Sequence, residues 1–448
     1  MQNTFLWRSS NIKKNRAITT LTLLMIILVP YYISGSSRAV YTITASIFVP
    51  AVFFIIFREL KREKDRTLIV LIIISIMLRI ALMIFIERTK ILMESDALVY
   101  HDQASEISKY LIGNTNLKGE TSAHAFGYVY FVSFIYAAYG IHQFMPKAIN
   151  AILGISVGII IYKISKRIFE DIKVSRLSAA FALFLPGTIV WSVSILKEQW
   201  VILMTMLSLY FCVNVRKEGF SAGKTLAVMA CIIGIWTMRF YIAILIIPIF
   251  IYATLAERRR NRLLLTLILI MALAVTTYAF AGRNIMGVEI SLTEVDARLR
   301  LLSTGGGSSI GETHDVSSLG GAIAYLPRGI TLLLFAPFPW KPATSVLYGL
   351  TYPEMLIYYL LIIPICIGFI RAIREKRKGL DIIIFFLVAG GVAYSMMSGN
   401  IGTLYRARVP LFLFLYMFGA KGMVEISNRM AERKGLQSLQ INLAESAL

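Results

Sequence analysis

Long apolar runs follow one another along most of the chain, and they constrain its fold more than any other feature. A helix needs about 20 apolar residues to cross a bilayer core. Runs near that size occur at about 17–35, 40–57, 67–86, 146–165, 176–194, 198–215, 263–281, 350–370, 380–397 and 409–425. Only 16% of the residues are charged, against about 25% in soluble proteins. The chain is therefore predicted to be an all-α polytopic membrane protein, which excludes a soluble globular enzyme, a disordered chain and a coiled coil.

Two arginines qualify this pattern. Residues 225–256 form a longer apolar stretch that Arg239 interrupts, and we expect a tight pair of short spans there. The pair brings the predicted total to about twelve transmembrane helices. Arg79 lies inside the span 67–86, where a charge costs about 2.5–3.5 kcal/mol, so its side chain should face the protein interior or a wet cavity.

Basic residues are concentrated between particular spans. The clusters are 8–16, 58–66, 163–176, 216–224, 257–262, 371–378 and the C-terminal tail. All of them fall on one side in the twelve-span arrangement, and such a side is cytoplasmic. We therefore expect both termini in the cytoplasm. The net charge of +21 is then explained by topology, and no nucleic-acid partner is expected.

Two apolar segments do not fit as spans. Residues 126–140 are too few, and residues 322–340 contain Pro327, Arg328, Pro337 and Pro339. Both are predicted to be re-entrant or interfacial helices at the outer face, where their aromatic side chains suit the headgroup region.

The chain is expected to divide into four parts. Residues 1–66 would form two N-terminal transmembrane helices, and 67–281 a core with the outer loop 87–145. Residues 282–349 would form a flexible outer loop and the re-entrant segment, and 350–448 the C-terminal helices and a cytoplasmic tail. The Gly- and Ser-rich composition of 303–321 favours a mobile segment, either a lid or a simple connector.

Reactive side chains are densest in MESDALVYHDQASEISKYLIG, residues 93–113. In a helix, Asp96, Tyr100 and Gln103 share one face, and Asp102 and Glu106 a second, wetter one. A carboxylate at the end of a span can act as a general base on an acceptor hydroxyl. The alternative for Asp96 is a helix-start acid that only stabilises the backbone dipole.

A second carboxylate, Glu198, follows the fifth predicted span on the same outer side. It could hold an acceptor or a divalent metal, or simply lie at the interface. The candidate metal ligands are Glu94, Asp96, His101 and His124, so a divalent metal is a candidate cofactor that the sequence alone does not decide.

Two arginines close together, Arg406 and Arg408, precede the last span in SGNIGTLYRARVPLF. Their planar donors match phosphate oxygens, although arginines at this depth also extend toward lipid headgroups. The sequence has no P-loop, no G-x-S-x-G and no H-E-x-x-H motif. The three cysteines lie in apolar runs and indicate neither a disulfide framework nor a metal site.

Together these motifs resemble the GT-C fold glycosyltransferases, especially the dolichyl-phosphate-mannose protein mannosyltransferases and bacterial aminoarabinose transferases. The resemblance rests on D-x-x-x-Y-H-x-x-A from Asp96, on GYVYFVSFIYAAYG, on PKAINAILGISVGIIIYKISKRIF and on GNIGTLYRARVPLFLFLYMFGAKG. PRGITLLLFAPFPW, with Arg328, is similar to family members whose genes lie in bacterial loci for envelope polysaccharides. The chain departs from the family in having two extra N-terminal spans and Glu94-Ser95-Asp96 instead of adjacent acids.

The resemblance implies a transferase of the bacterial inner membrane with a polyprenyl-phosphate- or diphosphate-linked sugar donor. The acceptor would be an envelope glycan, lipid or protein at the outer face. Asp96 would be the base and Glu198 a second catalytic acid, and Tyr100, His101, Arg328, Arg406 and Arg408 would contact substrate. Two alternatives stay open at this point: an O-antigen-type polymerase or ligase, and a non-enzymatic flippase or exporter of lipid-linked sugars.

Overall fold

The computed structural model describes most of the 448-residue chain. The described residues are 58, 63–89, 95–113, 125–255, 283–285, 288–290, 292–304, 309–312, 314–340, 349, 351–396 and 398–445. The chain divides into two compact units, Met1–Lys64 with Ser95–Ile149, and Asp65–Glu94 with Asn150–Leu448.

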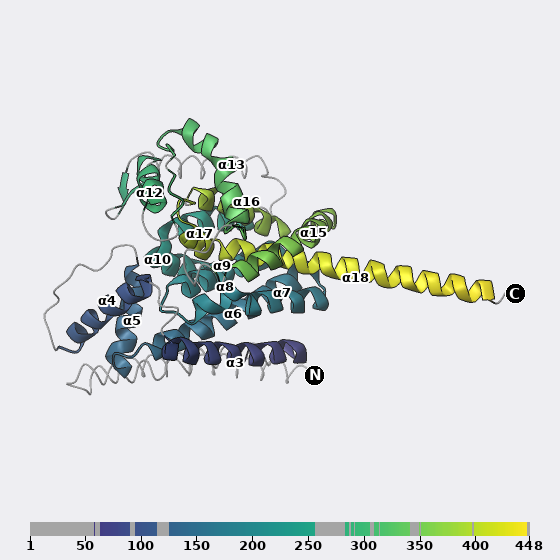
Figure 1. The fold of residues 1–448 in the computed structure, drawn as a ribbon, viewed down its shortest axis with the longest axis horizontal. Coiled ribbons are helices and arrows are strands. Elements are labelled where there is room, and N and C mark those ends of the chain that lie inside the picture. The colour runs from purple at the N-terminus through teal and green to yellow at the C-terminus, as the bar shows by residue number, and fades with distance from the viewer. Residues whose placement is uncertain are drawn as a thin grey trace, which may run out of the picture. The chain divides into compact units, whose positions relative to one another are not determined.

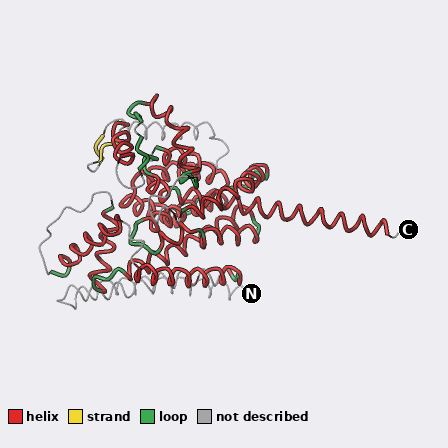
Figure 2. Tube along the Cα trace, in the orientation of Figure 1, coloured by secondary structure: helices red, strands yellow, loops and turns green. Residues whose placement is uncertain are grey.

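Helices make up nearly all of the described residues (Figure 2), which confirms the predicted all-α class. The first unit holds α4 (Ser95–Leu111), α5 (Phe126–Tyr139) and the start of α6 (Phe144–Phe169). The second unit holds the rest of α6 together with α3 (Arg66–Thr89), α7 (Ile172–Phe184), α8 (Pro186–Ser192), α9 (Glu198–Glu218), α10 (Ala222–Leu255), α12 (Leu292–Thr304), α13 (Leu319–Phe335), α15 (Tyr352–Arg374), α16 (Leu380–Ser395), α17 (Ile401–Ala407) and α18 (Val409–Glu445) (Figure 1). Two short strands, β1 (Arg283–Ile285) and β2 (Val288–Ile290), pair antiparallel.

Six described helices are long and apolar enough to cross a membrane: α3, α6, α9, α10, α15 and α18. The pair α7–α8, bent by 52°, is a seventh candidate. All seven lie on predicted apolar runs. In contrast, α16 has 16 residues and falls short of the usual span length. The predicted runs 17–35, 40–57 and 263–281 lie outside the described residues, so the total of about twelve stays a prediction.

The predicted pair of spans at 225–256 is present as a helical hairpin within α10. Its backbone leaves the helical region at Arg239, with φ −150° and ψ 80°. Arg239 Nη2 lies 2.5 Å from Glu198 Oε1, at the start of α9. Near the beginning of α10, Lys224 Nζ lies 2.9 Å from Glu218 Oε2, at the end of α9.

The far end of α10 returns to the end of α9. Tyr252 donates a hydrogen bond to Asp381 Oδ2 at 3.0 Å, and Arg216 Nε donates to the same oxygen at 2.7 Å. Both ends of α10 are therefore near the C-terminus of α9, and its middle is near the N-terminus of α9. We call these two levels of the second unit the Glu218 end and the Glu198 end.

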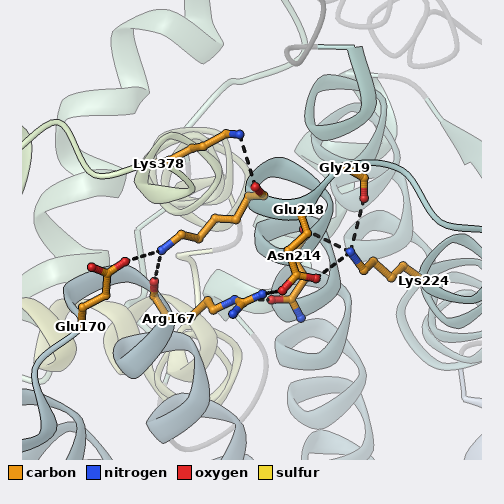
Figure 3. A network of polar contacts seen from close by, with 8 residues as sticks. Arg167, Glu170, Asn214, Glu218, Gly219, Lys224 and Lys378 are labelled. Atoms are coloured by element: carbon orange, nitrogen blue, oxygen red, sulfur yellow. Dashed lines mark hydrogen bonds and ion pairs between the residues drawn. The ribbon is translucent and has the colours of Figure 1, made fainter. Parts of the chain in front are cut away.

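The basic clusters meet at the Glu218 end (Figure 3). Lys217 Nζ lies 2.9 Å from Glu170 Oε1 and also donates to the carbonyl of Arg167. Lys378 donates to the carbonyl of Lys217 at 3.3 Å. Parts of the clusters 163–176, 216–224 and 371–378 thus lie together, as a shared side of the membrane requires.

Backbones approach closely where α15 packs against α18. A Cβ added to Gly368 would lie 1.9 Å from the carbonyl oxygen of Phe418, and one added to Gly422 would lie 1.9 Å from that of Pro364. Small residues at helix contacts are typical of membrane proteins, because van der Waals contact replaces the hydrophobic effect there.

The loop expected at 282–321 contains packed elements in its described parts. It contains both strands and α12, and Val316 is fully buried in an apolar cluster with Leu299 and Tyr325. Asp296 accepts a hydrogen bond from the Val316 amide at 2.9 Å. Composition gave no sign of this packing, because Gly and Ser outnumber the few apolar anchors, and the mobility of 303–321 stays a prediction.

The segment predicted at 322–340 begins earlier and ends earlier, as α13. Ser318 caps this helix by accepting a hydrogen bond from the Gly321 amide at 3.1 Å, and the helix continues through Pro327.

Candidate functional site

Aromatic contacts hold α4 on α5 in the first unit. The rings of Tyr100 and Tyr128 meet edge to face with centroids 5.5 Å apart. At the next residue of α4, His101 Nδ1 lies 2.7 Å from the Tyr136 hydroxyl, and the two rings are also edge to face. Since Tyr128 and Tyr136 are buried in α5, these contacts fix the rotation of α4.

This rotation decides which acids of α4 meet solvent. Asp96 lies in the first turn and is half-buried, and Tyr100 on the same face is buried. Asp102 and Glu106 are exposed, which confirms the predicted wetter face. A half-buried carboxylate beside a tyrosine can accept a proton from a bound hydroxyl.

The charge of His101 depends on its neighbours in the same unit. Partial burial lowers the pKa of His101, while Asp102 acts to raise it and Lys147 acts to lower it. The net direction is down, so the ring is neutral over a wider pH range than a free imidazole. A neutral ring can orient Tyr136 or relay a proton.

Glu198 lies at the Glu198 end of the second unit, buried between cations. Arg239 contacts its Oε1 atom, and Arg406 and Lys197 also interact with it electrostatically. Its Oε2 atom is buried and has no hydrogen-bond partner among the described residues. A carboxylate held this firmly is well placed to accept one more hydrogen bond, or to fix the arginines around it.

Arg406 and Trp191 extend this group. The Arg406 guanidinium lies over the Trp191 ring, 5.8 Å from its centroid, and Arg406 is only half-buried. The structure thus brings together Glu198 and Arg406, which the sequence predicted separately. It adds Trp191, which was not predicted, and Arg239, predicted only as the interruption between two spans.

Arg408 has a different environment from Arg406. It is 1% exposed, and its Nη1 atom donates to the carbonyls of Leu333, at 2.7 Å, and Ala336 at the C-terminus of α13. Its guanidinium lies 4.2 Å from the centroid of Phe412. A donor phosphate would have to displace these partners, so Arg406 fits the predicted phosphate contact better than Arg408.

Beside Arg408 lies a buried acid that sequence reasoning missed. Glu354, at the start of α15, lines a small pocket with Thr188, Tyr405, Arg408 and Tyr416. The charge in YPEML at the start of an apolar run was the available signal, and it looks like an ordinary interfacial acid.

Arg328 pairs with Glu312 on the surface of the second unit. Close by, the rings of His314 and Tyr325 lie 5.0 Å apart. Arg328, a predicted substrate contact, is therefore already paired with Glu312. A substrate anion would have to displace Glu312 to bind Arg328.

The predicted metal ligands are only partly described. Glu94 and His124 lie outside the described residues, while Asp96 and His101 lie on α4. Within the described part of the chain, no group of three or more His, Cys, Asp or Glu side chains could hold a metal ion.

The predicted site residues separate between the units. Asp96, Tyr100 and His101 belong to the first unit, and Glu198, Arg328, Arg406 and Arg408 belong to the second.

Residues 95–235 match the family model of dolichyl-phosphate-mannose-protein mannosyltransferase. The match begins with α4 and ends inside α10, so it includes Asp96, Tyr100, His101 and Glu198. No curated protein matches the chain. Over this segment, the chain is similar to a family of GT-C membrane glycosyltransferases, which confirms the resemblance predicted from its motifs.

Proposed function

We propose that this protein is a membrane glycosyltransferase that moves a sugar from a polyprenyl-phosphate-linked donor to an acceptor of the bacterial envelope. The acceptor is a glycan, a lipid or a protein at the outer face of the inner membrane. The observation that carries the proposal is that the family match begins on α4, whose first turn holds Asp96.

Asp96 is the proposed general base. The acceptor oxygen attacks the anomeric carbon of the donor sugar as Asp96 takes the hydroxyl proton, and the bond from that carbon to the phosphate oxygen breaks. The phosphate leaves with the bonding electrons. Its half-buried position and its place on the same face as Tyr100 support this role for Asp96.

Arg406 is the proposed contact for the donor phosphate. It is half-buried, lies over the Trp191 ring and interacts electrostatically with Glu198. A guanidinium fixed before the reaction stabilises charge that develops on a leaving phosphate without reorganising. Glu198 would then act through Arg406, as a positioning residue.

Sugar transfer from radiolabelled polyprenyl-phosphate donors to acceptors, with purified protein in detergent, tests the proposal. Asp96→Asn should lower the turnover by about a hundredfold or more, because general-base catalysis contributes that much. The matched control is Glu106→Gln, an exposed acid on the same helix, which should keep turnover within about twofold of the wild type.

Three outcomes would change the proposal. Full turnover in Asp96→Asn removes Asp96 as the base. A ladder of repeats instead of a single added sugar identifies a polymerase. A wild-type protein without turnover on any carrier favours an exporter of lipid-linked sugars.

A further inference from the structure

The bend between α7 and α8 removes one identifiable helical hydrogen bond. In a continuous helix, the carbonyl of Leu183 would accept from the amide of Gly187, four residues on. Here α7 ends at Phe184 and α8 begins at Pro186, with a bend of 52° between them. Pro186 has no N–H and its ring crowds the preceding turn, so the bend leaves polar backbone groups without helical partners.

A buried cation binds the free carbonyl at this break. Arg79 Nη1 donates to the Leu183 carbonyl at 3.1 Å. Its Nε atom donates to Ser192 Oγ at 2.9 Å, at the last residue of α8. Arg79 comes from α3 and is 1% exposed, so one guanidinium joins both sides of the break.

A buried carboxylate accepts a hydrogen bond from the free amide at this break. The Gly187 amide donates to Glu354 Oε2, from α15, at 2.6 Å. A Cβ added at Gly187 would lie 2.7 Å from the same oxygen, so the carboxylate approaches this closely because the residue is glycine. Glu354 is 5% exposed and also interacts electrostatically with Arg408.

The two ends of the missing bond thus each meet the charge that they prefer. The carbonyl oxygen carries partial negative charge and faces Arg79, and the amide hydrogen carries partial positive charge and faces Glu354. Without these partners, both backbone groups would be buried and unsatisfied. The lost bond between Leu183 and Gly187 has been replaced by two charged contacts from separate helices.

We propose that Arg79 and Glu354 are positioning residues, which hold α7–α8 bent and so set the place of Trp191 and Glu198. Trp191 directly precedes Ser192, which Arg79 holds, and Glu198 follows six residues later. The effect on catalysis rests on the proposed function, while the effect on the bend does not.

Spin-label distances measure the bend without any assay of activity. The background has Cys212, Cys231 and Cys366 replaced by alanine, with labels at Ile84→Cys on α3 and Lys197→Cys after α8. The seven residues of α8 span about 10 Å, so losing a bend of 52° would move their end by up to about 9 Å.

Arg79→Met, Glu354→Leu and Gly187→Ala should each change this distance by several ångströms. In transfer assays they should lower kcat about a hundredfold, as expected for a misplacement of about 1 Å, with the donor KM within about twofold of the wild type. Glu354→Gln keeps an acceptor for the Gly187 amide and should largely restore both readouts. The control Glu375→Gln, at the other end of α15, should leave the distance unchanged.

If the single variants do not fold, a variant that restores the continuous helix still tests the proposal. Arg79→Met, Pro186→Ala and Glu354→Leu together remove both charges and allow the Leu183–Gly187 bond to form. This triple variant should fold with a changed label distance and slow transfer.

A wild-type distance in the folded single variants, or in the triple variant, would overturn the proposal. So would a changed distance with a wild-type kcat, because the bend would then not position the reaction. If the wild type transfers no sugar, the proposed function fails, and the label distances still decide whether these residues hold the bend.

Discussion

Charged groups are used differently in the α4–α5 pair and in the interior of the second unit. On α4, aromatic residues supply the packing, and the acids Asp102 and Glu106 are exposed. In the second unit, Arg79, Glu354 and Arg408 are buried and bind backbone groups at interrupted or terminating helices. Charges of the first kind are available for chemistry, and charges of the second kind are part of the fold.

The largest expected effect comes from removing a charge of the second kind. Glu354→Leu should lower the free energy of unfolding by about 3 kcal/mol, since it leaves the buried Gly187 amide without a partner and removes a carboxylate that interacts electrostatically with Arg408. Asp96→Asn should cost less than about 1 kcal/mol, the usual worth of an acid in a first helical turn. Thermal midpoints in detergent compare the two, and equal midpoints would remove the distinction between the regions.

The two arginines before the last span sharpen the comparison within one short segment. Arg408→Ala should destabilise the protein by about 2 kcal/mol or more, because two buried carbonyls at the end of α13 lose their donor. Arg406→Ala should keep the thermal midpoint near that of the wild type and lower kcat/KM for the donor about a hundredfold or more. If the two variants exchange these phenotypes, Arg408 is the phosphate contact.

A smaller effect is expected where α4 packs on α5. Tyr136→Phe removes the hydrogen bond to His101 and keeps the ring, so the cost should be about 1 kcal/mol. Tyr130→Phe, at an exposed position of the same helix, is the control and should leave the thermal midpoint unchanged. A matching loss in both variants would mean that this hydrogen bond contributes nothing specific.

The smallest expected effect is the pH dependence of His101. Because its folded-state pKa is lowered, the folded protein binds fewer protons than the unfolded chain near that pKa. The stabilisation is complete above the unfolded value of about 6.5 and is lost as the pH falls toward the folded value. Thermal midpoints across this window should decline less in His101→Gln than in the wild type, and an equal decline would exclude His101 as the cause.

The sequence predicts the elements that burial alone dictates. The apolar runs at 67–86 and 146–165 correspond to α3 and α6, and the lone Arg239 marks the turn of the hairpin in α10. These helices, including those whose apolar run contains a single polar side chain, can be predicted from hydrophobic periodicity and composition. Both are local properties of the sequence.

Contacts between distant segments could not be predicted in this way. Arg79 and Leu183 are 104 residues apart, and Gly187 and Glu354 are 167 apart. Composition also gave no sign of the packing at Val316, which is buried although Gly and Ser are more numerous around it in the sequence. The proposed site residues Asp96, Glu198 and Arg406 could be predicted because their charges flank apolar runs. The partners of Glu198 could be identified only from the structure.

The hairpin in α10 has a consequence for how the chain enters the bilayer. Each half is short for an independent span, and the polar tip at Arg239 binds Glu198 of the preceding helix. Transferring that guanidinium alone through hydrocarbon is costly, but transferring it as an ion pair is less so. During biosynthesis, α9 and both arms of α10 are thus expected to leave the translocon as one cooperative module rather than helix by helix.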